Sequence, residues 1–278
     1  MILTSDKIED SLKQNNNEIS GILHQSKNKL NYDLRRYFPD GVVADLVEQY
    51  WFVDWTLEPG KEHLQQNLPD PNFHLVFENG KAKLIGPVSK VFSYKMANSG
   101  KVLGIKFKAG ALAEILPLSL DEFVNKELVA QAYFTESVEA LAAELNHDLA
   151  DQVIFNKMQN FLVPLVKNPS RQQLMVIEQL ELIKTTPEIT SVQQLSDRTH
   201  VSVRSLQRNF IKYLGLSPKW LIRKYRLHQA LSELENRETE VGDLVVRLGY
   251  TDQSHLIRDF KDILGVTPKG YKQAQQTR

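Results

Sequence analysis

The amino-acid sequence predicts an α+β fold, with a β-rich N-terminal half that also contains helices and an all-helical C-terminal half. β-rich runs occur between residues 37 and 108, and helical apolar spacing replaces them from about 120 to 166. A degenerate repeat of about 50 residues ends the chain. The segment 167–171 is a candidate linker that contains Asn, Pro and Ser. We therefore expect two domains, at 1–168 and 172–278.

Six residues of the repeat recur 50 positions later in the chain. They are Leu206, Arg208, Phe210, Leu214, Gly215 and Pro218, which recur as Leu256, Arg258, Phe260, Leu264, Gly265 and Pro268. In each copy the Gly favours a helix C-cap, the following Ser or Thr favours an N-cap, and the Pro suits a first helical turn. Each copy therefore predicts one helix that ends sharply and another that begins at once.

A shorter helical pattern precedes the long helix of each copy. Val192 and Leu195, and later Val241 and Leu244, have the i, i+3 spacing of a buried helix face. Ser191 is a suitable N-cap for the first of these helices. The upstream match has an offset of 49, so the turn of the second copy should be one residue longer. A short helix, a tight turn and a second helix form a helix-turn-helix unit.

We expect the two helix-turn-helix units at about 191–214 and 240–264, joined by a helix at about 218–235. The joining segment has apolar residues at helical spacing from Trp220 to Leu234. At 1.5 Å per residue this helix is roughly 25 Å long. Such a spacer is compatible with successive major grooves on one face of B-DNA, which lie about 34 Å apart.

The second helix of each unit has a predicted exposed ridge that suits DNA reading. The ridges carry Arg204, Gln207, Arg208 and Ile211 in the first unit, and Ser254, Ile257, Arg258 and Lys261 in the second. Arg pairs with guanine, and Gln with adenine, through two hydrogen bonds in the major groove. For a single helix of this kind, the alternative interpretation is an ordinary solvent-exposed face, on which Arg258 could form an ion pair with Asp262. Two matched copies favour DNA binding, with the first ridge contributing more specificity because it has three long polar side chains.

These motifs resemble the DNA-binding domain of the AraC/XylS-type transcription regulators over about residues 172–272. The second unit matches that family's pattern at Gly249-Tyr250, Ser254-His255, Arg258, Phe260-Lys261 and Gly265-Val-Thr-Pro268, and departs from it at Leu256, Val245 and Lys272. The resemblance implies base contacts by Arg204, Gln207, Arg208, Gln253, Ser254 and Arg258. We expect phosphate contacts by Ser205, Lys212, Lys219, His255, Lys261 and Lys269.

Charge and composition agree with a DNA-binding protein of two domains. The 278 residues have a formal net charge of zero, but residues 170–278 carry 17 Lys and Arg against 12 Asp and Glu, a balance of +5. A basic half is the electrostatic footprint expected for nucleic acid. The chain has no Cys, which excludes disulfides and thiolate metal sites, and it has neither a signal-peptide pattern nor a long apolar run. We expect a cytoplasmic protein with no membrane partner.

The N-terminal half contains three strong strand signals, at 50–55, 74–77 and 102–108, and a short helix is expected at about 6–14. Ile105 and Phe107 alternate with Lys106 and Lys108, which predicts one buried and one exposed strand face. This half resembles a cupin-like sensor domain that precedes some AraC-type regulators. The resemblance rests on Leu68-Pro69-Asp70, Leu75-Val-Phe77, Gly86-Pro87 and Gly104-Ile-Lys-Phe107-Lys-Ala-Gly110. It implies no defined ligand.

Candidate chemistry in the N-terminal half is sparse. The ligand-like residues His24, His63, His74 and Glu78 lack the close His-x-His spacing of metal cupins, so we expect no metal and no cofactor. No nucleophile with a base and no Gly-rich phosphate loop is evident, so we expect no catalytic residue and no enzyme activity. Trp51, Trp55, Phe73 and His74 are candidates to line an apolar ligand pocket, with a purely structural core as the alternative.

The sequence thus predicts a sequence-specific DNA-binding transcription regulator that is controlled by its N-terminal domain, through an unknown ligand or through dimerisation. Two alternatives stay open: a cupin-type enzyme with a DNA-binding tail, and a regulator that a protein partner controls without a small-molecule effector. The candidate partners are double-stranded DNA, a small-molecule effector, RNA polymerase and a second copy of the chain.

Overall fold

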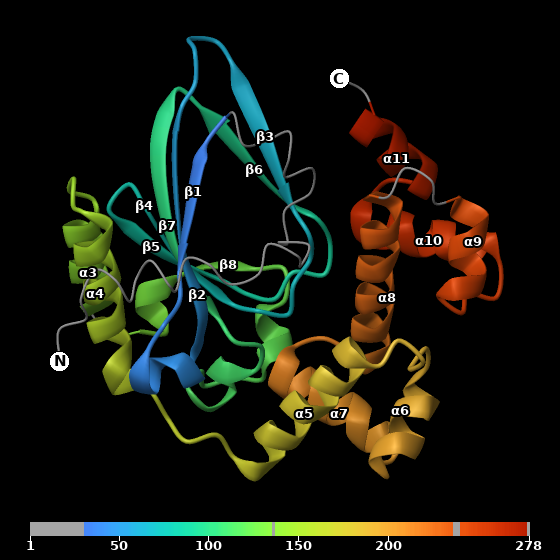
Figure 1. The fold of residues 1–278 in the computed structure, drawn as a ribbon. Helices are drawn as coiled ribbons and strands as arrows, with labels where there is room; N and C mark the ends of the chain where they lie inside the picture. The colour runs from blue at the N-terminus through green and yellow to red at the C-terminus, as the bar shows by residue number, and fades with distance from the viewer. Residues whose placement is uncertain (1–30, 135–136, 236–239, 277–278) are drawn as a thin grey trace.

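The structure is a computed structural model that describes residues 31–134, 137–235 and 240–276. Its β-rich part and its helical part lie side by side, and helices α3 (Ser137–Leu145) and α4 (Asp151–Leu162) lie on the far side of the β-rich part (Figure 1). The expected α+β architecture is confirmed. In the described part of the chain, no helix is long and apolar enough to cross a membrane.

The β-rich part contains a six-stranded and a two-stranded antiparallel sheet. In spatial order the large sheet consists of β1 (Asp33–Tyr37), β2 (Val47–Thr56), β7 (Ser99–Phe107), β4 (His74–Glu78), β5 (Lys81–Ile85) and β8 (Glu127–Val129). The small sheet pairs β3 (Glu62–Asn67) with β6 (Phe92–Ala97). The three strands that the sequence predicts are β2, β7 and β4, which are neighbours in the interior of the large sheet.

Two tryptophans of β2 lie across two glycines of β7. The strand register pairs Trp51 with Gly104 and Trp55 with Gly100. A Cβ atom placed on Gly104 would lie 2.1 Å from the Trp51 ring, and one on Gly100 would lie 2.2 Å from the Trp55 ring. Only glycine leaves room for the indoles at these two strand positions.

The two faces of the large sheet pack against different elements. Leu103, Ile105 and Phe107 of β7 join a large apolar core with residues of α3 and α4. Val102 joins a smaller core with Trp55, Val76 and Met96 on the opposite face. The expected alternation along β7 is thus observed for its apolar residues.

The segment 120–166 is helical only in part. It contains 3-10 turns at Leu120–Phe123, Ala130–Ala132 and Val163–Leu165, the short strand β8, and the helices α3 and α4. β8 pairs with β5 over three residues, which is too short to produce a periodic pattern. Further 3-10 turns occur at η1 (Gly41–Asp45) and η2 (Ala111–Glu114).

The break between α3 and α4 changes the phase of the apolar stripe. Val153, which continues the i, i+4 apolar spacing of Leu141, Leu145 and Leu149 in the sequence, is 41% exposed. Ile154 and Met158 are the buried residues of α4 instead. The strands also begin earlier than predicted, at Asp33. The expected helix at 6–14 and His24 lie outside the described residues.

The helical part consists of seven helices in the described residues. They are α5 (Arg171–Thr185), α6 (Val192–Thr199), α7 (Val203–Leu214), α8 (Pro218–Glu235), α9 (Val241–Arg247), α10 (Gln253–Leu264) and α11 (Pro268–Gln276). α8 stands between the group α5–α7 and the group α9–α11 (Figure 1). Its first turns pack into one apolar core through Leu221 and Ile222. Its later turns pack into a second core through Leu227, Leu231 and Leu234.

The helix caps follow the repeat in the sequence. Gly215 and Gly265 end α7 and α10 in the left-handed conformation, with φ of 75° and 74°. Ser217 Oγ accepts a hydrogen bond from the Trp220 N–H at 3.2 Å, and Thr267 Oγ1 accepts one from the Gly270 N–H at 3.0 Å. These bonds satisfy amide donors that a helix start leaves free, and they confirm the predicted caps.

Candidate DNA-binding surface

The first helix-turn-helix unit is built from α6, a three-residue turn and α7. Ser191 begins α6 with a capping box in which Gln194 takes part. His200 turns the chain with a left-handed φ of 54°. Ser202 then caps α7 by accepting a hydrogen bond from the Ser205 N–H at 3.3 Å. The unit closes over fully buried residues, which are Leu195, Leu206 and Phe210.

The second unit is built from α9, a longer turn and α10. Leu244 and Leu256 are fully buried, as are the equivalent Leu195 and Leu206 of the first unit. The sequence between the two leucines is one residue longer in the second unit. Asp252 caps α10 by accepting a hydrogen bond from the His255 N–H at 2.9 Å. Local capping and one buried face therefore produce the same unit twice.

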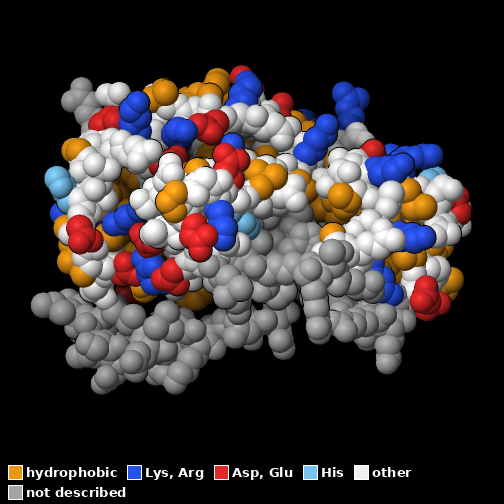
Figure 2. Space-filling view, turned by 90° about the horizontal axis from the view of Figure 1, so that it is seen from above, with side chains coloured by type: hydrophobic (Ala, Val, Ile, Leu, Met, Phe, Trp, Pro, Cys, Tyr) orange, Lys and Arg blue, Asp and Glu red, His pale blue; other side chains and the backbone are white. Residues whose placement is uncertain are grey.

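All six candidate base-contact residues are exposed on the recognition helices. They are Arg204, Gln207 and Arg208 on α7, and Gln253, Ser254 and Arg258 on α10. Among the candidate phosphate contacts, Lys212, Lys219, His255, Lys261 and Lys269 are exposed and Ser205 is half-buried. Lys and Arg side chains are also prominent over the helical part in Figure 2. The roles of these residues in DNA contact stay predictions.

The two carboxylates beside the second ridge are held by α8. Arg223 Nε donates to Asp259 Oδ1 at 2.8 Å, and Arg223 Nη2 donates to Asp262 Oδ2 at 2.8 Å. Burial alone would lower the pKa of Arg223, but the hydrogen bonds to both carboxylates raise it above its usual value. The ion pair that sequence spacing permits between Arg258 and Asp262 is replaced by this pair between helices.

A second arginine of α8 fixes the turn of the second unit. The Arg226 guanidinium lies 3.9 Å from the centre of the Tyr250 ring, and Arg226 Nε donates to the Leu248 carbonyl at 3.1 Å. Tyr250 donates from its hydroxyl to Asp259 Oδ2 at 3.2 Å. Burial, followed by the charge of Asp259, raises the pKa of Tyr250, which keeps the phenol a hydrogen-bond donor. Asp259 is therefore bound to α8 and to the turn at once.

Comparison with known proteins identifies the helical part. Residues 195–274 match the family model HTH_18, described as a helix-turn-helix domain. This part of the chain is an AraC-type helix-turn-helix domain. Residues 35–129 of the β-rich part match a domain of unknown function, DUF6597.

Several relatives of the chain are named as transcriptional regulators. YidL of Escherichia coli strain K12 is 29% identical over 149 residues, which cover 53% of this chain and 49% of YidL. YtdP of Bacillus subtilis is 30% identical over 87 residues, or 31% of this chain and 11% of YtdP. The activator RhaS of Escherichia coli is 27% identical over 81 residues, or 29% of each chain. The chain thus spans about half or less of the length of these relatives.

Solved structures show a distant likeness. ToxT from Vibrio cholerae aligns with a TM-score of 0.39 and 10% sequence identity, over 87% of this chain and 98% of ToxT.

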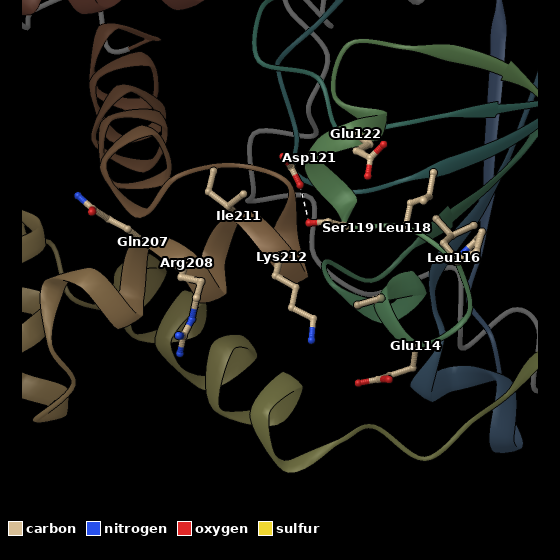
Figure 3. Close-up of a pocket in the computed structure, with 12 residues that line it drawn as sticks. Glu114, Leu116, Leu118, Ser119, Asp121, Glu122, Gln207, Arg208, Ile211 and Lys212 are labelled. Atoms are coloured by element: carbon tan, nitrogen blue, oxygen red, sulfur yellow. Dashed lines mark hydrogen bonds between the residues drawn. The ribbon is translucent and has the colours of Figure 1, made fainter.

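The ridge of α7 faces the β-rich part across a groove. The groove has a volume of about 790 Å³, and α7 contributes Gln207, Arg208, Ile211 and Lys212 to its lining. The opposite wall is the segment 113–122, whose acidic members are Glu114, Asp121 and Glu122. Figure 3 shows Glu114 and Lys212 on the two sides of this space. Three of the four residues of the predicted reading ridge on α7 therefore line a groove whose opposite wall carries three carboxylates.

Close contacts between the β-rich part and the helical part border this groove. η2 and the 3-10 turn η3 (Leu120–Phe123) pack against α7. A Cβ atom on Gly215 would lie 2.8 Å from the Leu120 carbonyl oxygen, so the glycine that ends α7 also permits close approach of the β-rich part. Gln173 Nε2 of α5 donates to the Gly110 carbonyl at 2.9 Å, and the Val91 N–H donates to the Ile263 carbonyl at 3.2 Å.

A buried polar cluster lies where α8 meets the β-rich part. Lys106 of β7 forms ion pairs with Glu48 at 2.7 Å and with Asp70 at 3.0 Å. Lys224 of α8 is 3% exposed and lies near the same carboxylates. Burial lowers the pKa of Lys224 to about 8, with a partial offset from the charge of Asp70. Burial, followed by the charge of Lys224, lowers the pKa of His228 to about 3.

The buried position of Lys106 differs from the sequence prediction. Its side chain is 15% exposed, whereas the alternation along the strand predicts an outward-facing lysine. The difference arises because the face that should be open to solvent is covered by the helical part near Lys224. Burial would raise the pKa of Asp70, but the charges of Lys106 and Lys224 hold it far below its usual value.

The candidate ligand-pocket residues are only partly brought together. Trp51 Nε1 donates to His74 Nδ1 at 3.2 Å, and burial lowers the pKa of His74 to about 4. Trp55 Nε1 donates to the Ala97 carbonyl at 3.1 Å. Phe73 packs against Phe123 in the large core. Their role in binding a ligand stays a prediction.

The candidate metal ligands occupy separate places. His63 lies 3.3 Å from Asn31, and Tyr94 donates a hydrogen bond to Glu78 at 2.5 Å. Among the residues that the structure describes, no group of three His, Cys, Asp or Glu side chains could hold a metal ion.

Sequence reasoning missed the role of Arg223 and of the segment 113–122. One signal for the first was available, because Asp259 lies on the buried stripe of α10, three residues after Leu256 and four before Ile263. A buried carboxylate requires a partner. The segment 113–122 carries no comparable local signal.

Proposed function

We propose that the protein is a sequence-specific DNA-binding transcription regulator whose helices α7 and α10 enter successive major grooves. The observation that carries this proposal is the attachment of two exposed reading ridges to one straight helix. The beginning of α8 is buried in the core of the first unit and its end in the core of the second. Its 18 residues span roughly 27 Å at 1.5 Å per residue. The expected site therefore has two half-sites about 10 base pairs apart on one face.

The β-rich part supports a role in control of DNA binding. The phosphates of a duplex border the major groove on both sides of an inserted helix. The segment 113–122 lies opposite α7 across the groove, and its carboxylates would repel phosphates that approach α7 from that side. We propose that the β-rich part restricts α7 in the arrangement described, and that a small-molecule effector or pairing with a second copy releases it.

The proposed role defines the partners and the location of the protein. Duplex DNA is the direct partner, RNA polymerase and a second copy of the chain are further candidates, and the expected location is the cytoplasm. The transcriptional regulators named among the relatives support this role over that of an enzyme.

The test is a selection of bound duplexes from a random pool with the full chain, followed by titration of the selected site. Arg208→Ala should weaken binding to the selected site by about 1–3 kcal/mol and should hardly change binding to random DNA. Arg208 is exposed in the middle of α7, so its removal should leave the fold intact. Failure to enrich any sequence would refute the proposed function. An equal loss on both DNAs would reduce Arg208 to a phosphate contact.

A further inference from the structure

Arg223 forms a polar connection between α8 and the second recognition helix. Its two nitrogen atoms Nε and Nη2 each lie 2.8 Å from a carboxylate oxygen, one of Asp259 and one of Asp262. The two carboxylates differ in environment, because the Asp259 side chain is 12% exposed and the Asp262 side chain is 53% exposed. Asp259 has a second donor in Tyr250. In the part of the chain that the structure describes, Asp262 pairs with Arg223 alone.

Asp262 is also placed to interact with the candidate base reader of the same helix. Residues four apart on a helix are neighbours on its surface, and oppositely charged pairs at this spacing attract each other. Asp262 follows Arg258 by four residues. A released Asp262 carboxylate would therefore draw the Arg258 guanidinium back onto the helix surface.

The first unit provides a comparison within the same chain. The residue four positions after Arg208 is Lys212, which repels an arginine instead of attracting it. The position equivalent to Asp259 is Asn209, which carries no charge. The first recognition helix thus has no carboxylate that must be held in place. Arg223 of α8 acts only on the second recognition helix, which has two carboxylates.

We infer that Arg223 is a positioning residue for DNA reading: by holding Asp262 against α8, it leaves Arg258 free to reach a base in the second half-site. The inference rests on the proposed function, and in particular on base contact by Arg258. Arg223 also has an electrostatic effect on the surface that approaches DNA. A released Asp262 carboxylate would add an unpaired negative charge beside a recognition helix that must approach phosphates.

The test compares three variants on the site that the wild-type chain selects. Arg223→Ala should weaken binding about threefold to tenfold and should reduce discrimination at the base under Arg258, because an exposed i, i+4 pair and an added negative charge both act against the contact. The double variant Arg223→Ala with Asp262→Asn should regain most of the affinity and of the discrimination. Asp262→Asn alone should bind at least as well as the wild type.

Arg247→Ala is the matched control. Arg247 of α9 also forms an ion pair with α8, at 2.9 Å from Glu233, and its removal deletes one arginine and one connection between helices without releasing Asp262. We expect this variant to keep its discrimination at the base under Arg258. Thermal unfolding of each variant reports any loss of stability that follows when Asp259 loses its ion pair with Arg223, and this loss is shared by the single and the double Arg223 variants.

The outcomes separate this inference from the proposed function. If the wild type enriches no sequence, the proposed function fails first. If the wild type binds specifically but Asp262→Asn does not restore the Arg223→Ala variant, Arg223 has only a structural role and the inference is wrong. If Arg247→Ala loses discrimination as strongly as Arg223→Ala, the effect belongs to general contact with α8 and the inference is again wrong.

Discussion

Lys224 should make DNA binding by the full chain depend on pH. The lysine is buried where α8 meets the β-rich part, and its pKa is lowered to about 8. Separation of the two parts would return the ammonium to water and to its ordinary pKa of 10.5. In the docked arrangement, the helical part packs against the β-rich part and the pKa of Lys224 is below its value in water. This difference in pKa stabilises docking fully above pH 10.5, and the stabilisation is lost as the pH falls through 8. Acidification therefore favours separation, which frees α7 for DNA.

The magnitude follows from the two pKa values. Between pH 7 and pH 9 the docking equilibrium should shift about tenfold toward the docked arrangement, or about 1.4 kcal/mol. The other groups that face Lys224 are Asp70, Glu48, Lys106, Lys184 and His228. The pKa values of Asp70 and of His228 are both lowered, so these two groups keep one protonation state across this range. The pKa of Lys106 is raised, because Asp70 and Glu48 outweigh its burial, so Lys106 stays charged.

Fluorescence anisotropy with the selected duplex measures this effect. The full chain should bind about tenfold more weakly at pH 9 than at pH 7. Lys224→Met should bind with nearly the same affinity at both pH values, since the group that titrates is gone. Lys219→Met, which removes an exposed lysine of the same helix, should keep the pH dependence while weakening binding overall. An unchanged pH dependence in Lys224→Met, or its loss in Lys219→Met, would refute the reasoning.

Three further predictions concern DNA binding and the fold. Affinity for duplex DNA should fall steeply with salt, with about 0.9 added to the slope of log K against log salt concentration for each neutralised phosphate; a salt-independent affinity would contradict phosphate contact. Randomising each half-site should show tighter base requirements under α7 than under α10, and the reverse result would exchange the roles of the two helices. Gly104→Ala should lower the unfolding free energy by more than about 2 kcal/mol in denaturant titration, because its Cβ would overlap the Trp51 ring. Gly242→Ala is the control: open space surrounds this position, so the unfolding free energy should not fall.

The helical part was predictable because its signals are local. A Gly that ends a helix, a Ser or Thr that caps the next and a Pro in its first turn act within a few residues, and the repeat showed each signal twice. The strands β2, β4 and β7 were predictable for a related reason, since interior strands are rich in apolar β-branched and aromatic residues. The edge strands β1 and β8, and the small sheet β3–β6, have mixed composition and gave no clear pattern.

Interactions between distant segments were decided by the tertiary structure alone. Arg223 meets Asp259 and Asp262 across 36 and 39 positions of sequence, and the buried cluster of Lys106 and Lys224 joins a strand to a helix more than 100 positions away. Charges and carbonyl groups interact through space, so their partners depend on how the elements pack. Composition and periodicity determined which helices the chain forms and which residues could read DNA. Only packing decided that the ridge of α7 faces the acidic segment 113–122. Packing also decided that the two carboxylates beside the ridge of α10 are held by Arg223 of α8.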